Sequence, residues 1–363
     1  MQASAAVLRD PNGPFAIESI EIGDLRPDEI IVRIVASGIC HTDIKFRDTV
    51  PKPVVLGHEG AGIVEKVGTG VTRVAVGDPV VLTFGFCGKC PSCESGAPAQ
   101  CADHHALQFK GARLDGTTAL SQNGAPLHGA FFQQSSFATH AVATERNAIP
   151  VPNDAPLDML GPLGCGVQTG AGAILNSLNV ASGSKVAVFG AGAVGLSAVM
   201  AAVTAGAAQI IAVDVVPTRL DLARDLGAHH VIDARDGDVA ARVREASGGG
   251  VHYALETAAV ESSFAAAIAS LTQRGVCGFV ASPVGRGTTP IVPFDMLING
   301  KTLCGVVQGS SVPQVFIPQL VDMIAAGRFP LERLVSWYDF ADINQAVADA
   351  ESGAAIKPIL RMH

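Results

Sequence analysis

The sequence predicts an α/β protein with a β-rich first lobe and a second lobe built on a doubly wound, six-stranded parallel sheet. The chain has 363 residues, more than the roughly 100 to 200 of one domain. Up to about residue 155, short Val- and Ile-rich runs are bounded by Gly, Pro and Asp, as in a lobe of short strands. From Lys185 onward, apolar runs alternate with Ala-rich helical segments, the pattern of a parallel sheet covered by helices.

The six strands expected in the second lobe are 185–190, 209–214, 229–234, 251–258, 275–281 and 302–309. Helices are expected between them, most clearly at 193–206 and 217–227. The tail predicts a helix at 312–327, a strand near 333–340, a helix at 341–353 and a strand at 355–362. We expect this tail to return to the first lobe. The catalytic domain would then span 1–158, completed by 310–363, and the dinucleotide-binding domain 159–309.

Composition excludes several classes of protein. Apolar residues make up 48% of the chain and charged residues 16%, with 40 glycines, which describes a compact globular protein. The formal charge is −8 without a basic run, so neither nucleic acid nor an anionic membrane is an expected partner. The start of the chain lacks a signal peptide pattern, and no apolar stretch reaches the roughly 18 to 20 residues of a membrane span. A cytoplasmic protein is expected.

A glycine-rich loop follows the first strand of the second lobe. Gly190, Gly192 and Gly195 match G-x-G-x-x-G between a strand and a helix. The first glycine allows the tight turn, the second admits a pyrophosphate and the third lets helix pack on strand, while the helix N-terminus attracts the phosphate charge. These glycines and Val194 of the same loop are the predicted dinucleotide contacts.

Asp214 closes the second strand of this lobe, nineteen residues after Gly195. A carboxylate there would accept hydrogen bonds from the adenosine ribose and repel a 2′-phosphate, which favours NAD over NADP. Arg219 follows five residues later and could accommodate a 2′-phosphate or lie in solvent on a helix. We take the carboxylate at the strand end as decisive and predict NAD.

Four of the eight cysteines lie in one short segment: Cys87, Cys90, Cys93 and Cys101, with the spacing C-x2-C-x2-C-x7-C. Four thiolates form a closed tetrahedral zinc site that stabilises a loop but has no open position for substrate. An iron–sulfur cluster also takes four thiolates, whereas disulfides are disfavoured in a reducing cytoplasm. The interpretation is a structural zinc ion.

Three other metal-binding side chains stand at glycine-flanked junctions: Cys40, His58 and Cys165. Each alone is more often a structural residue than a ligand. Together they form a known ligand set of a catalytic zinc, two thiolates and one imidazole with a fourth position open. Cys277 and Cys304 lie in apolar predicted strands and are assigned no role.

The order of these motifs resembles the zinc-dependent medium-chain alcohol dehydrogenases over nearly the whole chain. The matching segments are "GICHTD", "GHEGAGIVEKVG", "CGKCPSC", "LGCGVQTGAG" and "VFGAGAVGLSA". The resemblance implies a GroES-like catalytic domain and a Rossmann domain. The segments "FFQQSSFATHAV", "GVVQGSSVPQVFIPQL" and "AAIKPIL" are similar to the aryl-alcohol (benzyl alcohol) dehydrogenase branch, a pattern that allylic terpene-alcohol dehydrogenases share.

The resemblance implies a role for each residue near the first zinc. Cys40, His58 and Cys165 would ligate the catalytic ion, so the chain would bind two zinc ions. Asp43 would orient His58, and Glu59 would lie behind the metal as an occasional ligand. The ion would lower the pKa of an alcohol, and NAD would accept the hydride.

The resemblance also implies the proton path and two phosphate contacts. The hydroxyl of Thr42 would receive the substrate proton, and His41 and Lys357 would contact the cofactor pyrophosphate. Better-known members end the relay with a histidine where this chain has Lys45. An ammonium group of pKa about 10.4 is a poor base at neutral pH, so the last step could run through water.

The predicted reaction is the reversible oxidation of a primary aromatic or allylic alcohol to its aldehyde. Four phenylalanines either line the substrate pocket or belong to the core: Phe84, Phe86, Phe131 and Phe132. Terpene or aliphatic primary alcohols are alternative substrates. A zinc-free reductase of the same superfamily and a non-catalytic NAD-binding protein are alternative functions. Because the last predicted strand would expose an apolar sheet edge, a homodimer or homotetramer is expected.

Overall fold

The computed structural model describes residues 1–281 and 291–362, which divide into two compact units. The first unit contains Met1–Cys165, Val312–Ala325 and the chain from Leu331 onward, and the second contains Gly166–Ser311 and Ala326–Pro330. The expected boundaries were 158/159 and 309/310. The first boundary between the units lies between Cys165 and Gly166, later than expected. The reason is that helix α4 (Leu157–Leu160) and the turn Gly161–Gly164 pack on strands of the first unit.

Two antiparallel-rich sheets form the described part of the first unit. One has the order β4-β1-β2-β7-β8, with β1 Gln2–Leu8, β2 Ala16–Ile22, β4 Val54–Val55, β7 Leu120–Gln122 and β8 Ala125–Leu127. The other has the order β10-β6-β5-β3-β18-β17, with β9 also paired to β3. Its strands are β3 Glu29–Gly38, β5 Gly60–Val67, β6 Pro79–Leu82, β9 His140–Thr144, β10 Ala148–Pro150, β17 Val335–Asp339 and β18 Lys357–Arg361.

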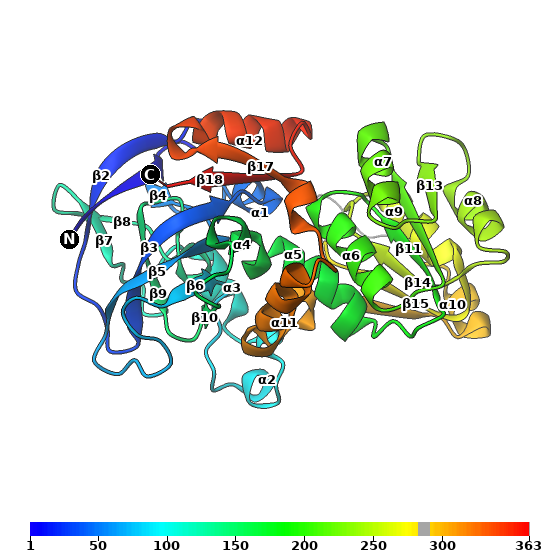
Figure 1. Ribbon diagram of the computed structural model, residues 1–363, viewed down its shortest axis with the longest axis horizontal. Coiled ribbons are helices and arrows are strands. Elements are labelled where there is room, and N and C mark those ends of the chain that lie inside the picture. Colours follow the sequence, from blue (N-terminus) through cyan, green and yellow to red (C-terminus); the bar gives the residue numbers. More distant parts are fainter. Residues whose placement is uncertain (282–290, 363) are drawn as a thin grey trace. The chain divides into compact units, whose positions relative to one another are not determined.

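The tail of the chain completes the second of these sheets. Strand β18 pairs antiparallel with β3, Ile359 opposite Gly38, and β17 pairs in parallel with β18. Helix α12 (Ile343–Ser352) lies along β17 and β18 (Figure 1). Helix α11 (Pro313–Ala325) contacts β10 and the Gly161–Gly164 turn. This pairing carries Lys357 at the start of β18 to the end of β3, where the metal-binding segment begins.

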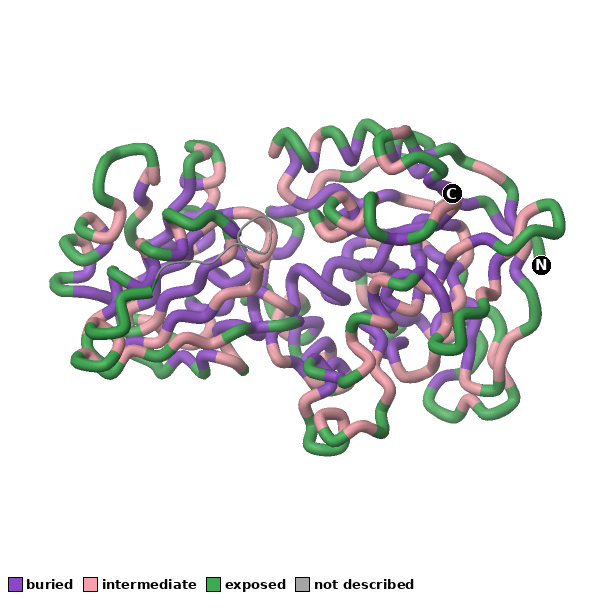
Figure 2. The backbone as a smooth tube through the Cα atoms, turned by 180° about the vertical axis from the view of Figure 1, so that it is seen from behind, coloured by how far each residue is buried: buried purple, intermediate pink, exposed green. Residues whose placement is uncertain are grey.

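The short helices of the first unit follow its strands. They are α1 His41–Lys45, α2 Pro91–Glu94 and α3 His104–Phe109. A hydrophobic core joins β1, β4 and α12 with the buried rings of Phe84, Phe131 and Phe137. Figure 2 shows the strands mainly as buried chain, whereas several connecting loops are exposed. The Cys87–Cys101 segment is mostly exposed or half-buried.

The second unit contains the predicted parallel sheet, with the order β13-β12-β11-β14-β15-β16. The strands are β11 Lys185–Phe189, β12 Gln209–Asp214, β13 His230–Asp233, β14 Val251–Glu256, β15 Leu271–Phe279 and β16 Thr302–Gly305. The reversal of strand order next to β11 is that of a doubly wound, Rossmann-type sheet, so the predicted fold class is confirmed. Strand β16 ends earlier than expected because the chain turns at Gln308–Ser310, where φ is positive.

Helix α5 Gly166–Gly172 precedes β11, and the helices between the strands are α6 Ala193–Thr204, α7 Pro217–Asp225, α8 Val239–Ala246, α9 Glu261–Ala269 and α10 Pro293–Asn299. Helix α6 follows β11 directly and is buried from Gly195 through Ala202. It packs against α5. None of the helices that the structure describes is long and apolar enough to cross a bilayer.

Candidate active site and metal centres

The turn before β5 carries His58 and Glu59 between two glycines that the packing requires. Gly57 has φ +90°, and a Cβ there would lie 2.4 Å from the backbone nitrogen of Phe137. A Cβ on Gly60 would lie 2.7 Å from Cβ of Ser136. The turn therefore lies directly against the segment 134–137, and both His58 and Glu59 are fully buried. Sequence patterns had predicted the glycine flanks but not what they touch.

Three segments bring the predicted catalytic ligands together. Cys40 precedes α1 at the end of β3, and Cys165 follows the Gly161–Gly164 turn. One ligand atom each from Cys40, His58, Cys165 and Glu59 lies within 4.8 Å of the other three. Residues separated by more than a hundred positions thus form one cluster of metal-binding side chains.

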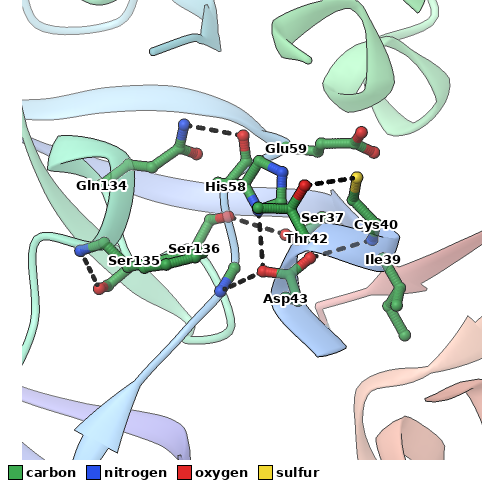
Figure 3. A network of polar contacts seen from close by, with 12 residues as sticks. Ser37, Ile39, Cys40, Thr42, Asp43, His58, Glu59, Gln134, Ser135 and Ser136 are labelled. Carbon is green, nitrogen blue, oxygen red and sulfur yellow. Dashed lines mark hydrogen bonds and ion pairs between the residues drawn. The ribbon is translucent and has the colours of Figure 1, made fainter. Parts of the chain in front are cut away.

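Hydrogen bonds fix the orientation of the His58 ring (Figure 3). Its Nδ1 lies 2.8 Å from Oδ1 of Asp43. Asp43 also accepts hydrogen bonds from the backbone nitrogens of Cys40 at 3.0 Å and Gly57 at 3.1 Å. The buried Nε2 of His58 has no hydrogen-bond partner among the described residues. A carboxylate on one ring nitrogen and a free second nitrogen are typical of a histidine that binds a metal.

The charges of the cluster favour a cation. Contact with the Cys165 thiol lowers the pKa of Cys40 well below its usual range. Contact with Cys40, together with burial, raises the pKa of Cys165. Burial lowers the pKa of His58, but the carboxylate of Asp43 and contact with Cys40 together raise it to about 10. Two thiols and an imidazole in one buried site suit a zinc ion, which takes thiolate and imidazole ligands.

Lys357 and Glu59 form a buried ion pair beside the cluster. The Lys357 ammonium lies 3.0 and 2.9 Å from the two carboxylate oxygens of Glu59, and it donates to the carbonyl of Ile39 at 3.2 Å. Both side chains are at most 3% exposed. Burial raises the pKa of Glu59, and the attraction of Glu59 raises that of Lys357 despite burial. The pair was not foreseen, and the expected contact of Lys357 with pyrophosphate stays a prediction.

The predicted proton-path residues lie on α1. Thr42 is half-buried, with Oγ1 3.7 Å from Sγ of Cys40. His41 and Lys45 are exposed at the two ends of this five-residue helix. Thr42 thus lies two residues after Cys40, and the expected roles of Thr42, His41 and Lys45 stay predictions.

Aromatic rings surround His58. Phe132 stacks on its imidazole with centroids 4.2 Å apart at 25°, and Phe131 meets it edge-on at 5.5 Å. Phe84 lies 6.0 Å from the half-buried Phe86. Phe109, which sequence reasoning overlooked, contacts both Phe131 and Phe132. Phe84, Phe131 and Phe132 are thus buried core residues, and Phe131 and Phe132 also form an aromatic wall beside the metal cluster.

The four clustered cysteines form a second site. Their sulfur atoms lie within 4.8 Å of one another, with Sγ of Cys87 and Cys93 4.0 Å apart. Sulfurs bound to one tetrahedral zinc at about 2.3 Å lie about 3.8 Å apart, so the loop fits this ion. The backbone nitrogen of Cys87 donates to Cys101 Sγ, and that of Ala102 donates to Cys90 Sγ and lowers its pKa to about 6. Burial instead raises the pKa of Cys93 to about 12.

The glycine loop of the second unit has the backbone that dinucleotide binding requires. Gly190 has φ +96°, and a Cβ on Gly195 would lie 1.8 Å from the Gly190 carbonyl oxygen. A Cβ on Gly192, at the N-terminus of α6, would meet no described atom within 4 Å. The first and third glycines serve turn and packing, and the second faces open space that a phosphate could occupy. Val194 lies half-buried in the first turn of α6.

Asp214 lies at the end of β12, as expected. Its carboxylate accepts hydrogen bonds from the backbone nitrogen of Ala191 in the glycine loop and from those of Val215 and Val216 at 2.8 and 2.9 Å. The acid therefore also ties β12 to this loop. Arg219 is half-buried on α7, and its Nε is buried without a hydrogen-bond partner within the described ranges.

Comparison with known proteins adds relatives along the whole chain. A family model described as "Alcohol dehydrogenase GroES-like domain" matches residues 26–153, and one described as "Zinc-binding dehydrogenase" matches 193–326. Geraniol dehydrogenase of Castellaniella defragrans is 44% identical over 99% of this chain and 98% of its own. The structure of benzyl alcohol dehydrogenase from Acinetobacter calcoaceticus is 44% identical, with TM-score 0.97 and full coverage of both chains.

A third relative is the structure of an alcohol dehydrogenase zinc-binding domain protein from Burkholderia ambifaria. It is 53% identical, with TM-score 0.98, and the match covers 100% of this chain and 99% of that one. The two metal-binding clusters, the glycine loop and these matches lead to one conclusion. The chain belongs to the zinc-dependent medium-chain alcohol dehydrogenase family.

Proposed function

We propose that the protein catalyses the reversible, NAD-dependent oxidation of a primary aromatic or allylic alcohol to its aldehyde. The cluster of Cys40, His58 and Cys165 carries the proposal, because its ligand atoms converge and Nε2 of His58 has no hydrogen-bond partner among the described residues. Two thiolates and one imidazole leave the fourth position of a zinc ion open to substrate. The four-cysteine loop holds a second zinc ion that is closed to substrate.

When bound, the catalytic zinc supplies Lewis acidity that lowers the pKa of the substrate hydroxyl, and NAD supplies the hydride acceptor. The chain supplies the positioning. Asp43 holds Nδ1 of His58 and so directs Nε2 to the metal. The hydroxyl of Thr42 accepts the substrate proton. As this hydroxyl takes up the substrate proton, its own proton would pass to water, because Lys45 lies exposed at the end of α1.

Support for the alcohol class comes from the aromatic wall and from two relatives. Phe131 and Phe132 pack on the ring of His58, so flat, apolar substrate surface suits this side of the site. One relative at 44% identity is named geraniol dehydrogenase and another benzyl alcohol dehydrogenase. Both names denote alcohols whose carbinol carbon adjoins a π-system, which stabilises the developing carbonyl.

Initial rates on benzyl, cinnamyl, geranyl and short aliphatic alcohols test the substrate class. We expect kcat/KM for the first three alcohols to exceed that for butanol by at least about 10-fold, because a phenyl or alkenyl group buries more apolar surface and each 1.4 kcal/mol of binding is a factor of ten. Equal values for butanol and benzyl alcohol would contradict the aromatic or allylic preference. They would leave the dehydrogenase assignment intact.

We propose NAD as the cofactor because Asp214 places a carboxylate at the end of β12. Asp214→Ala should weaken NAD binding and reduce the rejection of NADP, since the acid supplies both a hydrogen bond and a repulsive charge. The ratio of the dissociation constants for NADPH and NADH, measured by fluorescence, should fall by about 10-fold or more. Asp221→Ala, on the exposed face of α7, is the control. If cofactor preference and affinity were both unchanged in Asp214→Ala, this carboxylate would not contact the ribose.

We also propose a homodimer that pairs the edges of two second-unit sheets. Strand β16 pairs only with β15 among the described strands. Helix α10 beside it exposes large apolar side chains, with Phe294 71% and Leu297 77% exposed. A second copy of the chain covers both features through one two-fold contact. Sedimentation should show twice the 37.1 kDa chain mass, and Leu297→Glu should shift it toward monomer. A monomer at micromolar concentration would contradict this assembly.

A further inference from the structure

We propose that Gln134 is a positioning residue for the metal ligand His58. Its side-chain amide holds the backbone of the turn that carries the ligand, and the strained segment Ala130–Ser135 directs this amide to the backbone of His58 and the ring of Phe132 to its imidazole. The inference rests on the proposed assignment of His58 to the catalytic zinc.

The contacts of Gln134 bridge three parts of the first unit. Its Nε2 donates to the carbonyl oxygen of His58 at 3.0 Å and to that of Thr83, which follows β6, at 3.2 Å. Its Oε1 accepts from the backbone nitrogen of Gly60 at 3.0 Å. The residue is 1% exposed. Figure 3 shows the bond from this amide to the His58 carbonyl. One buried amide thus satisfies backbone groups on both sides of Glu59 and ties them to the strand end at Thr83.

Gln134 and Asp43 hold the ligand from two ends. Asp43 binds Nδ1 of the ring and the backbone nitrogen of Gly57, whereas Gln134 binds the carbonyl of His58 and the nitrogen of Gly60. The ring also stacks on Phe132 at 4.2 Å. The backbone before and after His58 and the imidazole itself are therefore all fixed. A metal ligand fixed in this way loses little conformational entropy when the ion binds.

Backbone strain marks the segment that presents Gln134. Four non-glycine residues of this segment have positive φ: Ala130 at 72°, Phe132 at 53°, Gln133 at 55° and Ser135 at 51°. Such conformations cost about 1 to 3 kcal/mol each and persist only where the surroundings enforce them. Oγ of Ser135 accepts from the nitrogen of Phe131 at 2.9 Å and donates to the carbonyl of Val55 at 2.7 Å.

A second enforcing contact comes from Asn147, whose Nδ2 donates to the carbonyl oxygen of Gln133 at 3.2 Å and to that of Thr83 at 3.1 Å. The segment is therefore held at the same strand end that Gln134 binds. In an extended strand, residues two positions apart point to the same face, so the side chains of Phe132 and Gln134 would lie side by side on one face. The left-handed residues instead place an aromatic ring on the imidazole and an amide on the adjacent backbone, and strained backbone is common at such functional sites.

The neighbouring Gln133 provides a matched control. Its Nε2 donates to the carbonyls of Leu107 and Ala130, and its side chain forms no hydrogen bond with the His58 turn among the described residues. Gln134→Met removes all three hydrogen bonds at nearly constant volume. Gln134→Glu keeps the acceptor for Gly60 but cannot donate to His58 and Thr83 when ionised. Gln133→Met changes the same side-chain type one position earlier.

The experiment measures zinc loss to a chelator from the full-length protein, with thermal unfolding in parallel. A Cys165→Ser chain, which keeps only the four-cysteine zinc, gives the signal of that site alone. In Gln134→Met the catalytic zinc should leave about 10-fold faster than in the parent, as for loss of other groups that orient a metal ligand. Gln134→Glu should also accelerate the loss, because an ionised carboxylate would face the carbonyl oxygens of His58 and Thr83 without a donor. The four-cysteine zinc should leave at the parent rate in both, and Gln133→Met should match the parent throughout.

Two results would overturn the proposal. One is equal zinc loss in Gln134→Met and Gln133→Met. The other is equal acceleration at both zinc sites together with a lower melting temperature, which would make Gln134 a general structural residue. If Gln134→Met does not fold, the same comparison is made with Gln134→Glu. Failure of the underlying assignment looks different, because Cys165→Ser would then retain two zinc ions.

Discussion

The two candidate metal-binding clusters of the first unit are built in opposite ways. Cys87, Cys90, Cys93 and Cys101 come from one loop, and only Cys101 among them is buried. The catalytic cluster takes its ligands from three segments that lie far apart in the sequence, and His58 and Cys165 are buried. Short spacing thus makes the first cluster a local structure, whereas the second exists only when β3, β5 and the Gly161–Gly164 turn have packed together.

The difference extends to what surrounds each cluster. The loop cysteines receive backbone hydrogen bonds from Cys87 and Ala102 within the loop itself. The catalytic cluster is supported by Asp43, by Gln134 and by the buried pair of Lys357 with Glu59. A loop that closes on an ion gains folding stability from it. A site that must keep an open position needs a protein frame that stands without the ion.

The largest expected effect is on turnover, from the mutation Cys165→Ser. A serine hydroxyl is a poor zinc ligand, and loss of the Lewis acid should lower kcat by at least about 1,000-fold, since zinc lowers the pKa of a bound hydroxyl by several units. Melting temperature and NADH affinity should stay near those of the parent. A large loss of stability with turnover per folded molecule retained would reverse the roles of the two clusters.

The next effect is on stability, from the mutation Lys357→Met. It leaves the Glu59 carboxylate buried without its cation, which should lower the free energy of unfolding by about 3–5 kcal/mol at neutral pH. Burial already raises the pKa of Glu59, and loss of the ammonium raises it further. The folded variant then binds a proton that the unfolded chain releases. The loss in free energy of unfolding should therefore shrink as the pH falls through that raised pKa.

Two variants control this measurement. Lys357→Met combined with Glu59→Gln removes both charges and should recover part of the lost stability. Arg146→Met, beside the four-cysteine loop, breaks only a half-exposed pair with Asp28 and should cost at most about 1 kcal/mol. Denaturant titration between pH 5 and 8 gives all four values. A deficit for Lys357→Met that is small, or that grows on acidification, would show that this ion pair does not support the catalytic cluster.

A smaller stability effect is expected from the mutation Cys93→Ser in the loop. Metal binding there contributes folding energy, of which a three-cysteine site would retain a part. A loss of about 2–4 kcal/mol corresponds to a fall of about 4–16 °C in melting temperature for a unit of this size. Activity per folded molecule should remain within a few-fold of the parent. Abolished hydride transfer with unchanged melting temperature would show that this loop serves chemistry.

Sequence pattern predicted the second unit and the local cluster well. Strands β11 and β12, the glycine loop and Asp214 lie where the apolar runs and the G-x-G-x-x-G spacing indicated. The reason is physical proximity along the chain: a buried parallel strand, its turn and the following helix determine each other within about 30 residues. The four-cysteine loop is local for the same reason. The ends of strands were less predictable, as the early end of β16 shows.

The sequence by itself determined which residue types were available: paired cysteines and a histidine at glycine-flanked junctions, and a carboxylate at a strand end. Only the tertiary structure decided how they are held. The bond from Gln134 to the carbonyl of His58 and the pair of Lys357 with Glu59 join residues 76 and 298 positions apart. Nothing in the local pattern distinguishes these partners from other polar residues, because their hydrogen bonds arise only when β18 and the strained segment pack against the turn before β5. Burial then makes each partner obligatory, since an unpaired amide or charge in the core is costly.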